Sequence, residues 1–307
     1  MINYTIIIPH KNIPQLLQRC LDSTPRRDDV QIIIIDDNSD SDKVDFKNFP
    51  AMNDPFVEII FGKNENGRKG AGYARNLGLE KAKGNRLIFA DADDFFMPCF
   101  NEVLDKYKDD ENDIIYFKAT SVDLQTMQPA TRHQYINDCL EKIQKTNNWD
   151  LACLLHNPVG KFIKKDIVEK NKILFREVHK ANDIYFGVKV ATKATSKSIA
   201  KETIYCISSR ENSLTKQNSV KALKIKFNEI YISAVYLEKI GKKYHFLGVL
   251  CICWKKIADA SILQSILLLP KMIRMCGVRR TKESIRESGN FTVKNLVKRI
   301  INFIKNE

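Results

Sequence analysis

The stretch that decides the fold is NENGRKGAGYARNLGLEKAKGNRLIFADADDFFMP, residues 64–98. A polar turn leads into a helix predicted over Ala71–Ala82, and Gly84 is expected to break that helix. The apolar run Leu87–Ala90 then predicts a buried strand over Arg86–Ala90. Three carboxylates follow this strand directly: Asp91, Asp93 and Asp94.

Carboxylates at the carboxyl end of a buried strand lie where open α/β sheets bind ligands. Three of them this close repel one another unless a cation joins them. Hard divalent ions such as Mg²⁺ take oxygen ligands and often share them with substrate phosphates. The segment therefore predicts a metal and phosphate site, and a solvated acidic loop is the less favoured interpretation.

The rest of the first 215 residues alternates strands and helices. Apolar runs predict strands at 4–8, 30–35, 56–61, 113–120 and 202–207, and helical spacing predicts helices around 16–21 and 184–194. Short links between such elements indicate an α/β sheet that is mostly parallel and flanked by helices. Residues 121–150 are polar and are expected to be irregular.

Charge is unevenly distributed along the 307 residues, whose formal net charge is +13. Residues 216–307 hold 19 Lys and Arg against 6 Asp and Glu, which leaves 31 of each kind in residues 1–215. We therefore expect a neutral domain over 1–215 and a basic helical region over 216–307. The eight cysteines include no CxxC pair, so a zinc site is not expected.

Two further acidic sites each allow two interpretations. Asp36-Asp37-Asn38-Ser39 follows a predicted strand, where it could bind uracil or ribose, or only form a turn. Asp183 begins a predicted helix, where it could cap the helix or act as a general base. Nothing in the neighbouring residues decides either case.

Glycines and histidines near these sites give weaker signals. Gly70 and Gly72 do not complete a dinucleotide fingerprint, because Arg75 fills the position of its third glycine. Arg75 instead suits a charge partner for carboxylate or diphosphate. His10 could line a nucleotide pocket and His179 could contact metal or phosphate, but a structural or surface role is the favoured interpretation of each.

The order of these motifs resembles family 2 glycosyltransferases of the GT-A fold, of the kind that builds bacterial polysaccharides. The similar segments are IIIPHKN (6–12), IIIIDDNS (32–39), NENGRKGAGYARNLGLEKAKG (64–84), LIFADADD (87–94), NPVGKF (157–162), ILFREVHKANDIYF (173–186) and SSRENSLT (208–215). Two positions depart from the family pattern. His10 stands where an aromatic residue, often Tyr, is common, and Asn182 stands where many relatives have Glu.

The resemblance implies a role for each matching residue. The implied donor nucleotide-binding residues are Pro9, His10, Asn12, Asp36, Asp37, Arg75 and Asp91. Asp93 would be the direct ligand of Mg²⁺ or Mn²⁺, with Asp91 as a possible second ligand, and Asp183 would be the catalytic base. Contacts to the diphosphate, sugar or acceptor are implied for Asp94, Lys161, His179 and Arg210.

The implied activity is an inverting transfer of one sugar from a nucleotide-sugar, with UDP expected, to a hydroxyl of a glycan or lipid-linked acceptor in surface polysaccharide synthesis. A nucleotidyltransferase and a protein that only binds sugar nucleotide are the alternatives. A nucleotidyltransferase should have a glycine-rich loop after its first strand, and Pro9–Pro14 contains no glycine. Release of free nucleoside diphosphate would separate a transferase from a binding protein.

The basic tail suggests a surface partner. Apolar residues over Val293–Ile304 recur on one helical face with lysines and arginine elsewhere, and such helices bind anionic lipid. Packing on the catalytic domain is the alternative, and nucleic acid is not expected because no aromatic-rich recognition module is present. The chain opens directly into a strand and has no uncharged apolar run of about 18–20 residues. We therefore expect a cytoplasmic protein, peripheral on the inner face of the cell membrane.

Overall fold

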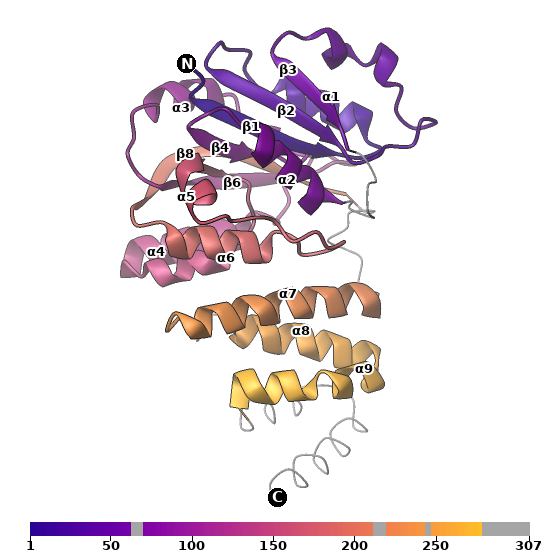
Figure 1. Ribbon diagram of the computed structural model, residues 1–307, viewed down its shortest axis with the longest axis vertical. Helices are drawn as coiled ribbons and strands as arrows, with labels where there is room; N and C mark the ends of the chain where they lie inside the picture. The colour runs from indigo at the N-terminus through magenta and orange to yellow at the C-terminus, as the bar shows by residue number, and fades with distance from the viewer. Residues whose placement is uncertain (63–69, 211–218, 243–246, 278–307) are drawn as a thin grey trace, which may run out of the picture. The chain divides into compact units, whose positions relative to one another are not determined.

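A computed structural model describes residues 1–62, 70–210, 219–242 and 247–277 of the chain (Figure 1). The chain separates into two compact units, Met1–Ser213 and Leu214–Glu307. The first unit combines a sheet with flanking helices, and the described part of the second unit is helical. The predicted α/β class with a helical C-terminal extension is therefore confirmed.

The described strands of the first unit form a sheet in the order β3-β2-β1-β4-β7-β6-β8-β5. The strands are β1 (Tyr4–His10), β2 (Val30–Asp36), β3 (Val57–Phe61), β4 (Arg86–Phe89), β5 (Phe95–Phe96), β6 (Ile114–Asp123), β7 (Lys161–Lys164) and β8 (Lys197–Ser209). The pairs among β1 to β4 are parallel, as is β6 with β8. However, β7 runs antiparallel between β4 and β6, and β5 runs antiparallel to β8.

The centre of the sheet is apolar on both faces, as expected of parallel strands covered by helices. Ile6, Ile7 and Ile8 of β1 are fully buried, and β1 pairs in register with β2 up to the last pair, His10 with Asp36. Because β1, β2 and β4 run in the same direction, their carboxyl ends meet at one edge. The polar residues that follow these three strands are thereby brought together.

Helices flank the sheet (Figure 1). They are α1 (Pro14–Asp22), α2 (Ala71–Lys81), α3 (Phe100–Lys106), α4 (Gln134–Thr146), α5 (Lys165–Lys170) and α6 (Ile184–Lys193). Helix α2 packs on β1 and β2. A Cβ atom at Gly78 of α2 would lie 2.5 Å from Ile7 Cγ2, so only glycine allows this close packing.

The predicted cause of the α2 terminus is wrong. The helix ends at Lys81, before Gly84, and Gly84 is not among the glycines with positive φ. A Cβ atom at Gly84 would lie 2.4 Å from the carbonyl carbon of Tyr4, and its N–H donates to Thr5 Oγ1 at 2.8 Å. Glycine is needed there because the chain passes directly against β1.

The expectation of an irregular segment over 121–150 is also wrong. β6 continues to Asp123, and α4 buries Ile136, Leu140 and Ile143, which lie four and three residues apart on one face. A 3₁₀ segment, η4 (Trp149–Leu154), follows and contacts both α4 and α6. This apolar face packs α4 on β6.

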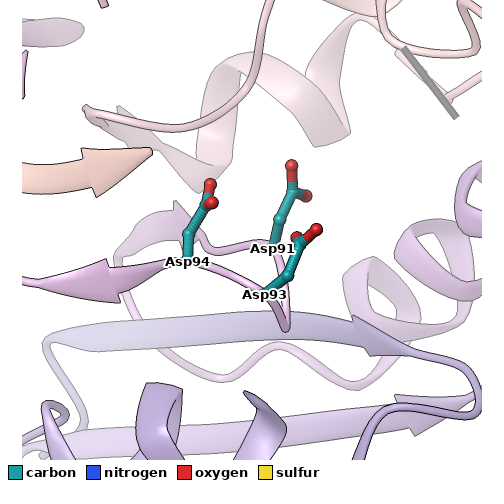
Figure 2. A group of neighbouring side chains, drawn as sticks. All are labelled: Asp91, Asp93 and Asp94. Carbon is teal, nitrogen blue, oxygen red and sulfur yellow. The ribbon is translucent and has the colours of Figure 1, made fainter. Parts of the chain in front are cut away.

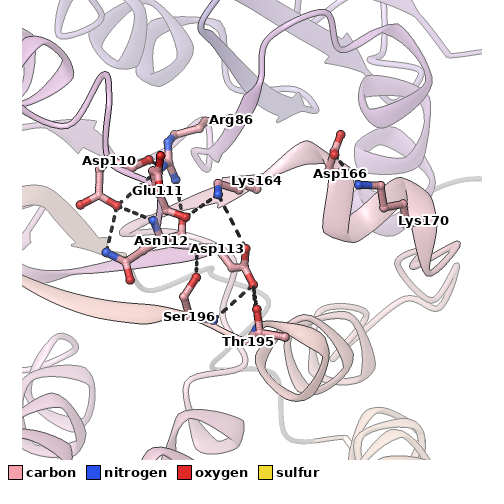
Figure 3. Close-up of polar contacts among 10 residues, drawn as sticks. All are labelled: Arg86, Asp110, Glu111, Asn112, Asp113, Lys164, Asp166, Lys170, Thr195 and Ser196. Carbon is pink, nitrogen blue, oxygen red and sulfur yellow. Dashed lines mark hydrogen bonds and ion pairs between the residues drawn. The ribbon is translucent and has the colours of Figure 1, made fainter.

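A polar network fixes the end of the sheet where β4 begins (Figure 3). The Arg86 side chain is 4% exposed and donates to the carbonyl oxygens of Asn112, at 3.0 Å, and Asp110. Asp113 accepts from the N–H and Oγ1 of Thr195 at 2.7 and 2.8 Å. Burial would raise the pKa of Asp113, but these hydrogen bonds outweigh it and lower the pKa.

The second unit contains the helices α7 (Val220–Lys239), α8 (Leu247–Ala260) and α9 (Ile262–Leu267). Helix α8 packs on both others, and the Trp254 indole N–H donates to the Ser265 carbonyl at 3.0 Å. Among the described residues, none of the helices combines the length and apolar character required to span a bilayer. The expected amphipathic face over Val293–Ile304 lies outside the described residues.

Candidate active site

Three carboxylates converge in the loop after β4 (Figure 2). The ligand oxygens of Asp91, Asp93 and Asp94 all lie within 4.8 Å of one another. The Asp94 N–H donates to the Asp91 carbonyl at 2.9 Å, so a tight turn brings all three side chains to one place. The structure thus gathers the residues that the DADD stretch presents in sequence.

Burial and the charges of neighbouring carboxylates make the ionised forms in this cluster unfavourable. Burial raises the pKa of Asp93, with the Asp91 charge adding to the effect. Burial raises the pKa of Asp94 well above its ordinary value, and Asp91 and Asp93 raise it further. Both carboxylates therefore favour a compensating cation. All three offer hard oxygen ligands, so the donor set fits Mg²⁺ or Mn²⁺.

Two arginines already contact the cluster. Arg75 of α2 donates to Asp91 Oδ1 at 2.6 Å, and Arg210, just after β8, donates to Asp93 Oδ2 at 2.9 Å. Arg75 is buried, whereas the Arg210 side chain is 31% exposed. The two guanidiniums, from segments far apart in the sequence, neutralise part of the charge.

Residues of β8 form hydrogen bonds with the acidic loop that follows β4. The Ser208 N–H donates to Asp94 Oδ1 at 2.7 Å, and the Asp91 N–H donates to the Tyr205 hydroxyl at 2.8 Å. Arg19 of α1 donates to the Asp93 carbonyl at 2.6 Å and to Ser208 Oγ at 2.9 Å. The position of the loop is therefore fixed by its backbone and by Asp94, whereas the Asp91 and Asp93 side chains keep 40% and 19% of their surface exposed.

At the ends of β1 and β2, His10 and Asp36 form a buried pair. His10 Nδ1 lies 2.9 Å from Asp36 Oδ1, and His10 Nε2 accepts from the Ile13 N–H at 3.1 Å. Because Nε2 accepts, Nδ1 carries the proton that goes to Asp36. Ser39 also donates to Asp36 through its N–H and Oγ, as in an Asx turn. Burial would raise the pKa of Asp36, but the hydrogen bonds from His10 and Ser39 lower it.

Asp37 and Asn12 lie beside the His10–Asp36 pair. Asp37 Oδ1 accepts from the Gly70 N–H at 2.8 Å, at the amino end of α2. Asn12 exchanges hydrogen bonds with Asp40, at 2.9 and 2.7 Å, and its N–H donates to Ser39 Oγ. Pro9 pairs with Ile35 inside the sheet. Of the neighbouring carboxylates Asp36 and Asp37, it is therefore Asp37 that contacts the amino end of α2.

Asp183 lies at the amino end of α6, but its side chain makes no capping hydrogen bond. Asp183 therefore does not cap α6 through a side-chain hydrogen bond. Its neighbour Asn182 accepts from Arg75 at 2.8 Å, so one guanidinium holds both Asn182 and Asp91. Burial would raise the pKa of Asp183, but His156 and Arg75 outweigh this effect and lower the pKa.

Lys161 and His179 lie in contrasting environments. Lys161 is 6% exposed, and its ammonium donates to the carbonyl oxygens of Leu155, at 2.6 Å, and Asn157. His179 is exposed in the irregular segment before α6. Lys161 therefore holds backbone, and His179 is available to solvent and ligand.

Sequence reasoning missed Arg19, His156 and Tyr205. Arg19 and Tyr205 lie within elements that the sequence predicts, but no local pattern says that their side chains turn toward the acidic loop. His156 lies 27 positions before Asp183, yet their side chains approach to 3.8 Å. Only the folded chain brings these pairs together.

Comparison with known proteins finds a sequence family whose match includes the acidic loop. The sequence model described as Glycosyl transferase family 2 matches residues 5–181. EpsH of Bacillus subtilis (strain 168), a putative glycosyltransferase, is 22% identical over 301 residues, covering 93% of this chain and 81% of EpsH. TarP of Staphylococcus aureus (strain N315), a poly(ribitol-phosphate) beta-N-acetylglucosaminyltransferase, is 28% identical over 241 residues, covering 76% of this chain and 69% of TarP.

A solved structure matches the fold. S. aureus TarS 1–349 in complex with UDP-GlcNAc has a TM-score of 0.61 and 16% sequence identity, covering 92% of this chain and 81% of TarS 1–349. At this identity the likeness shows a shared fold. The matched family span contains the acidic loop, the β1 and β2 ends and Asn182's partner Arg75, but it stops before Asp183.

Proposed function

The chain belongs to glycosyl transferase family 2, and we propose that it moves one sugar from a UDP-sugar to a hydroxyl of a glycan or lipid-linked acceptor during surface polysaccharide synthesis. One observation carries the proposal. Arg75 bonds to Asp91, in the acidic loop, and to Asn182, the residue before Asp183. A site for the leaving diphosphate and a base for the acceptor are thereby joined by a single buried side chain.

The donor nucleotide is assigned to the edge formed by the ends of β1 and β2. Pro9, His10 and Asn12 border this edge, where Asp36 is fixed by His10 and Ser39. Asp37 is the carboxylate assigned to the base or ribose, since its contacts reach outward to Gly70. The UDP-GlcNAc bound by TarS and the N-acetylglucosaminyl transfer named for TarP support a UDP-linked donor.

Asp93 and Asp91 are assigned to Mg²⁺ or Mn²⁺, with Asp94 supporting the loop. When bound, such an ion stabilises the negative charge that develops on the leaving diphosphate. Arg75 braces the same region, and Arg210 and His179 are assigned to contacts with the diphosphate or the acceptor. Lys161 acts on the site indirectly, through the backbone it holds.

The chemical step assigned to Asp183 is proton removal from the acceptor hydroxyl. The acceptor oxygen then forms a bond to the anomeric carbon on the face opposite the diphosphate. The bond between that carbon and the diphosphate oxygen breaks, its electron pair leaves with UDP, and the configuration inverts. The lowered pKa of Asp183 keeps it ionised, as a base must be.

The test of the base is Asp183→Asn, measured as UDP release and as product with defined anomeric configuration. Transfer should fall by about 10²–10⁴-fold, because general-base assistance is lost. Donor binding, followed by thermal shift with UDP-sugars and Mn²⁺, should stay within about twofold of wild type. Asp166→Asn, at an exposed carboxylate on α5, is the matched control. Normal turnover in Asp183→Asn would disprove the assignment, and donor binding without UDP release by wild type would indicate a binding protein.

A membrane-surface contact is proposed for the second unit. Leu263 and Leu267 of α9 are 66% and 62% exposed, and Ile252 of α8 is 62% exposed. Lysines Lys255 and Lys256 lie on α8 as well, which suits an anionic surface. We place the protein at the inner face of the cell membrane, where a lipid-linked acceptor would be found.

Vesicle co-sedimentation of the full chain tests this contact. Vesicles that contain anionic lipid should retain more wild-type protein than zwitterionic vesicles, and the difference should shrink in high salt. The double variant Lys255→Glu/Lys256→Glu should lose most of the anionic preference. Equal retention of wild type and variant would reject the contact.

A further inference from the structure

Three neighbouring strands end side by side at the edge assigned to the donor nucleotide. His10 of β1 pairs in register with Asp36 of β2, and Asp36 pairs with Phe61, the last residue of β3. In the described sheet β3 is the outermost strand on this side (Figure 1). Residues paired across neighbouring strands project to the same face of a sheet. An imidazole, a carboxylate and a phenyl ring therefore lie in one row.

His10 offers no ring face to a ligand. It is 2% exposed, its Nδ1 donates to Asp36, and its Nε2 accepts from the Ile13 N–H. Its ring also meets the ring of Phe46 at a centroid distance of 5.9 Å, with the planes at 88°. His10 therefore holds Asp36 in place and is enclosed by the protein.

Phe61, by contrast, is 49% exposed. Phe46, of the 3₁₀ segment η1 (Phe46–Asn48), lies against it with centroids 5.0 Å apart and planes at 88°. Phe46 in turn contacts Phe49, which is buried. The Phe61 ring is thus supported by packed aromatic side chains and open to solvent elsewhere. Because single exposed apolar side chains are common on protein surfaces, the neighbours of Phe61 decide what its exposure means.

Those neighbours are polar and fixed. The Gly62 N–H donates to the Asp36 carbonyl at 2.8 Å, so the chain directly after Phe61 is tied to β2. A Cβ atom at Gly62 would lie 3.7 Å from Asn38 Nδ2, a buried nitrogen that has no hydrogen-bond partner among the described residues. Asp37, the carboxylate assigned to the base or ribose, precedes Asn38 in the chain. An open aromatic ring thus adjoins an unused amide donor and a carboxylate, and nucleobases are recognised by stacking together with hydrogen bonds at their edges.

We propose that Phe61 is the ring on which the base of the donor nucleotide stacks, with Phe46 supporting it. This inference rests on the proposed UDP-sugar donor. A pyrimidine is planar, so it can cover the exposed part of the Phe61 ring while its polar edge turns to Asp37 and Asn38. A purely structural role, in which Phe61 only covers Phe46, predicts a loss of stability on truncation without a change in nucleotide binding.

Calorimetric titration with UDP and Mn²⁺ tests the stacking. Phe61→Ala should weaken UDP binding by about 5–150-fold, the range that follows when one stacked base loses its aromatic partner. Phe61→Tyr keeps the ring and should stay within about threefold of wild type. Phe61→Leu keeps apolar surface without a flat ring and should resemble Phe61→Ala. UDP affinity of wild-type strength in Phe61→Leu would overturn the proposal.

Two controls separate stacking from a general loss of binding. Inorganic pyrophosphate with Mn²⁺ carries a diphosphate without a base, so wild type and Phe61→Ala should bind it equally. Met52→Ala removes another exposed apolar side chain, which is 42% exposed on η2 (Pro50–Asn53), and it should leave UDP affinity unchanged. Parallel losses of pyrophosphate and UDP binding in Phe61→Ala would show that the substitution disturbs the whole site, and the proposal would be wrong.

Failure of the stacking and failure of the proposed donor give different results. If wild type and Phe61→Ala bind UDP equally, the donor assignment stands and the stacking is wrong. If wild type binds CDP or GDP in place of UDP, and Phe61→Ala weakens that binding, the stacking stands and the assignment of uracil fails. If wild type binds none of the three nucleotides, both are wrong.

Discussion

The two ends of β4 treat charge in opposite ways. At the start of the strand, buried Arg86 meets backbone carbonyls, and Asp113 nearby has its pKa lowered by hydrogen bonds (Figure 3). At the other end, the carboxylates of Asp93 and Asp94 have raised pKa values because they are buried beside like charges (Figure 2). The difference indicates that one end of the strand stabilises the fold. At the other end, negative charge is not fully neutralised by the protein, which suits a bound cation.

The largest effect is expected from a substitution that changes only the acidic loop after β4. Asp93→Ala should lower transfer by at least about 10²–10³-fold, because it removes the proposed direct ligand and its charge stabilisation. Unfolding in urea with chelator present should show no loss of stability. UDP-sugar binding with and without Mn²⁺, measured by calorimetry, should become identical. A variant that still binds donor more tightly with Mn²⁺ would refute the ligand assignment.

The second effect breaks the structural end. Arg86→Met leaves the carbonyl oxygens of Asp110 and Asn112 without their buried donor and should cost about 2–4 kcal/mol of unfolding free energy. The rate per folded molecule should remain that of wild type. Lys170→Ala, which removes the exposed partner of Asp166 on α5, is the control and should leave the urea midpoint unchanged. Loss of activity without loss of stability in Arg86→Met would mean that the two ends are not separable.

A third experiment uses pH to compare the ends. Because the pKa of Asp94 is raised in the folded state, the folded protein binds this proton more tightly than the unfolded chain. Metal-free wild type is therefore destabilised at neutral pH relative to Asp94→Asn. The gap in unfolding free energy should close as the pH falls through the raised pKa toward the ordinary value of 3.8. A gap that does not change between pH 7 and 4.5 would show that the repulsion is negligible.

The smallest effect sharpens the description of the ligand end. Arg210 is a partly exposed guanidinium that pairs with Asp93, so it competes with any incoming cation. Arg210→Gln should raise Mn²⁺ affinity in the absence of nucleotide by about twofold to fivefold. Calorimetric titration of metal alone measures this. Weaker Mn²⁺ binding by the variant would show that Arg210 supports the site rather than competing for it.

The sequence predicts most of the strands because their β-branched runs are unbroken, as in Ile32–Ile35. It predicts the crowding of Asp91, Asp93 and Asp94 because they are neighbours in the chain. It does not predict that β7 enters the sheet antiparallel, since strand pairing leaves no mark in a four-residue run. Helix α4 was missed because polar residues surround its three buried positions.

Long-range side-chain contacts set the second limit. Arg75 is a recognisable charge in the sequence, but nothing local indicates that it reaches both Asp91 and Asn182. The same holds for His156, whose orientation depends on the Lys161 contacts and on the bare backbone of Gly187. These geometries depend on how separate elements pack, and single-sequence patterns contain only what lies within one element.

The bridge made by Arg75 has a consequence for how such an enzyme could change its specificity. The guanidinium links Asp91, at the proposed site of the departing group, to Asn182, which precedes the proposed base Asp183. If these roles hold, the residues that select the sugar and the acceptor can change independently while the spacing of the reacting groups stays constant. A change of substrate would then require new pocket-lining residues but no change in the residues of the chemical step.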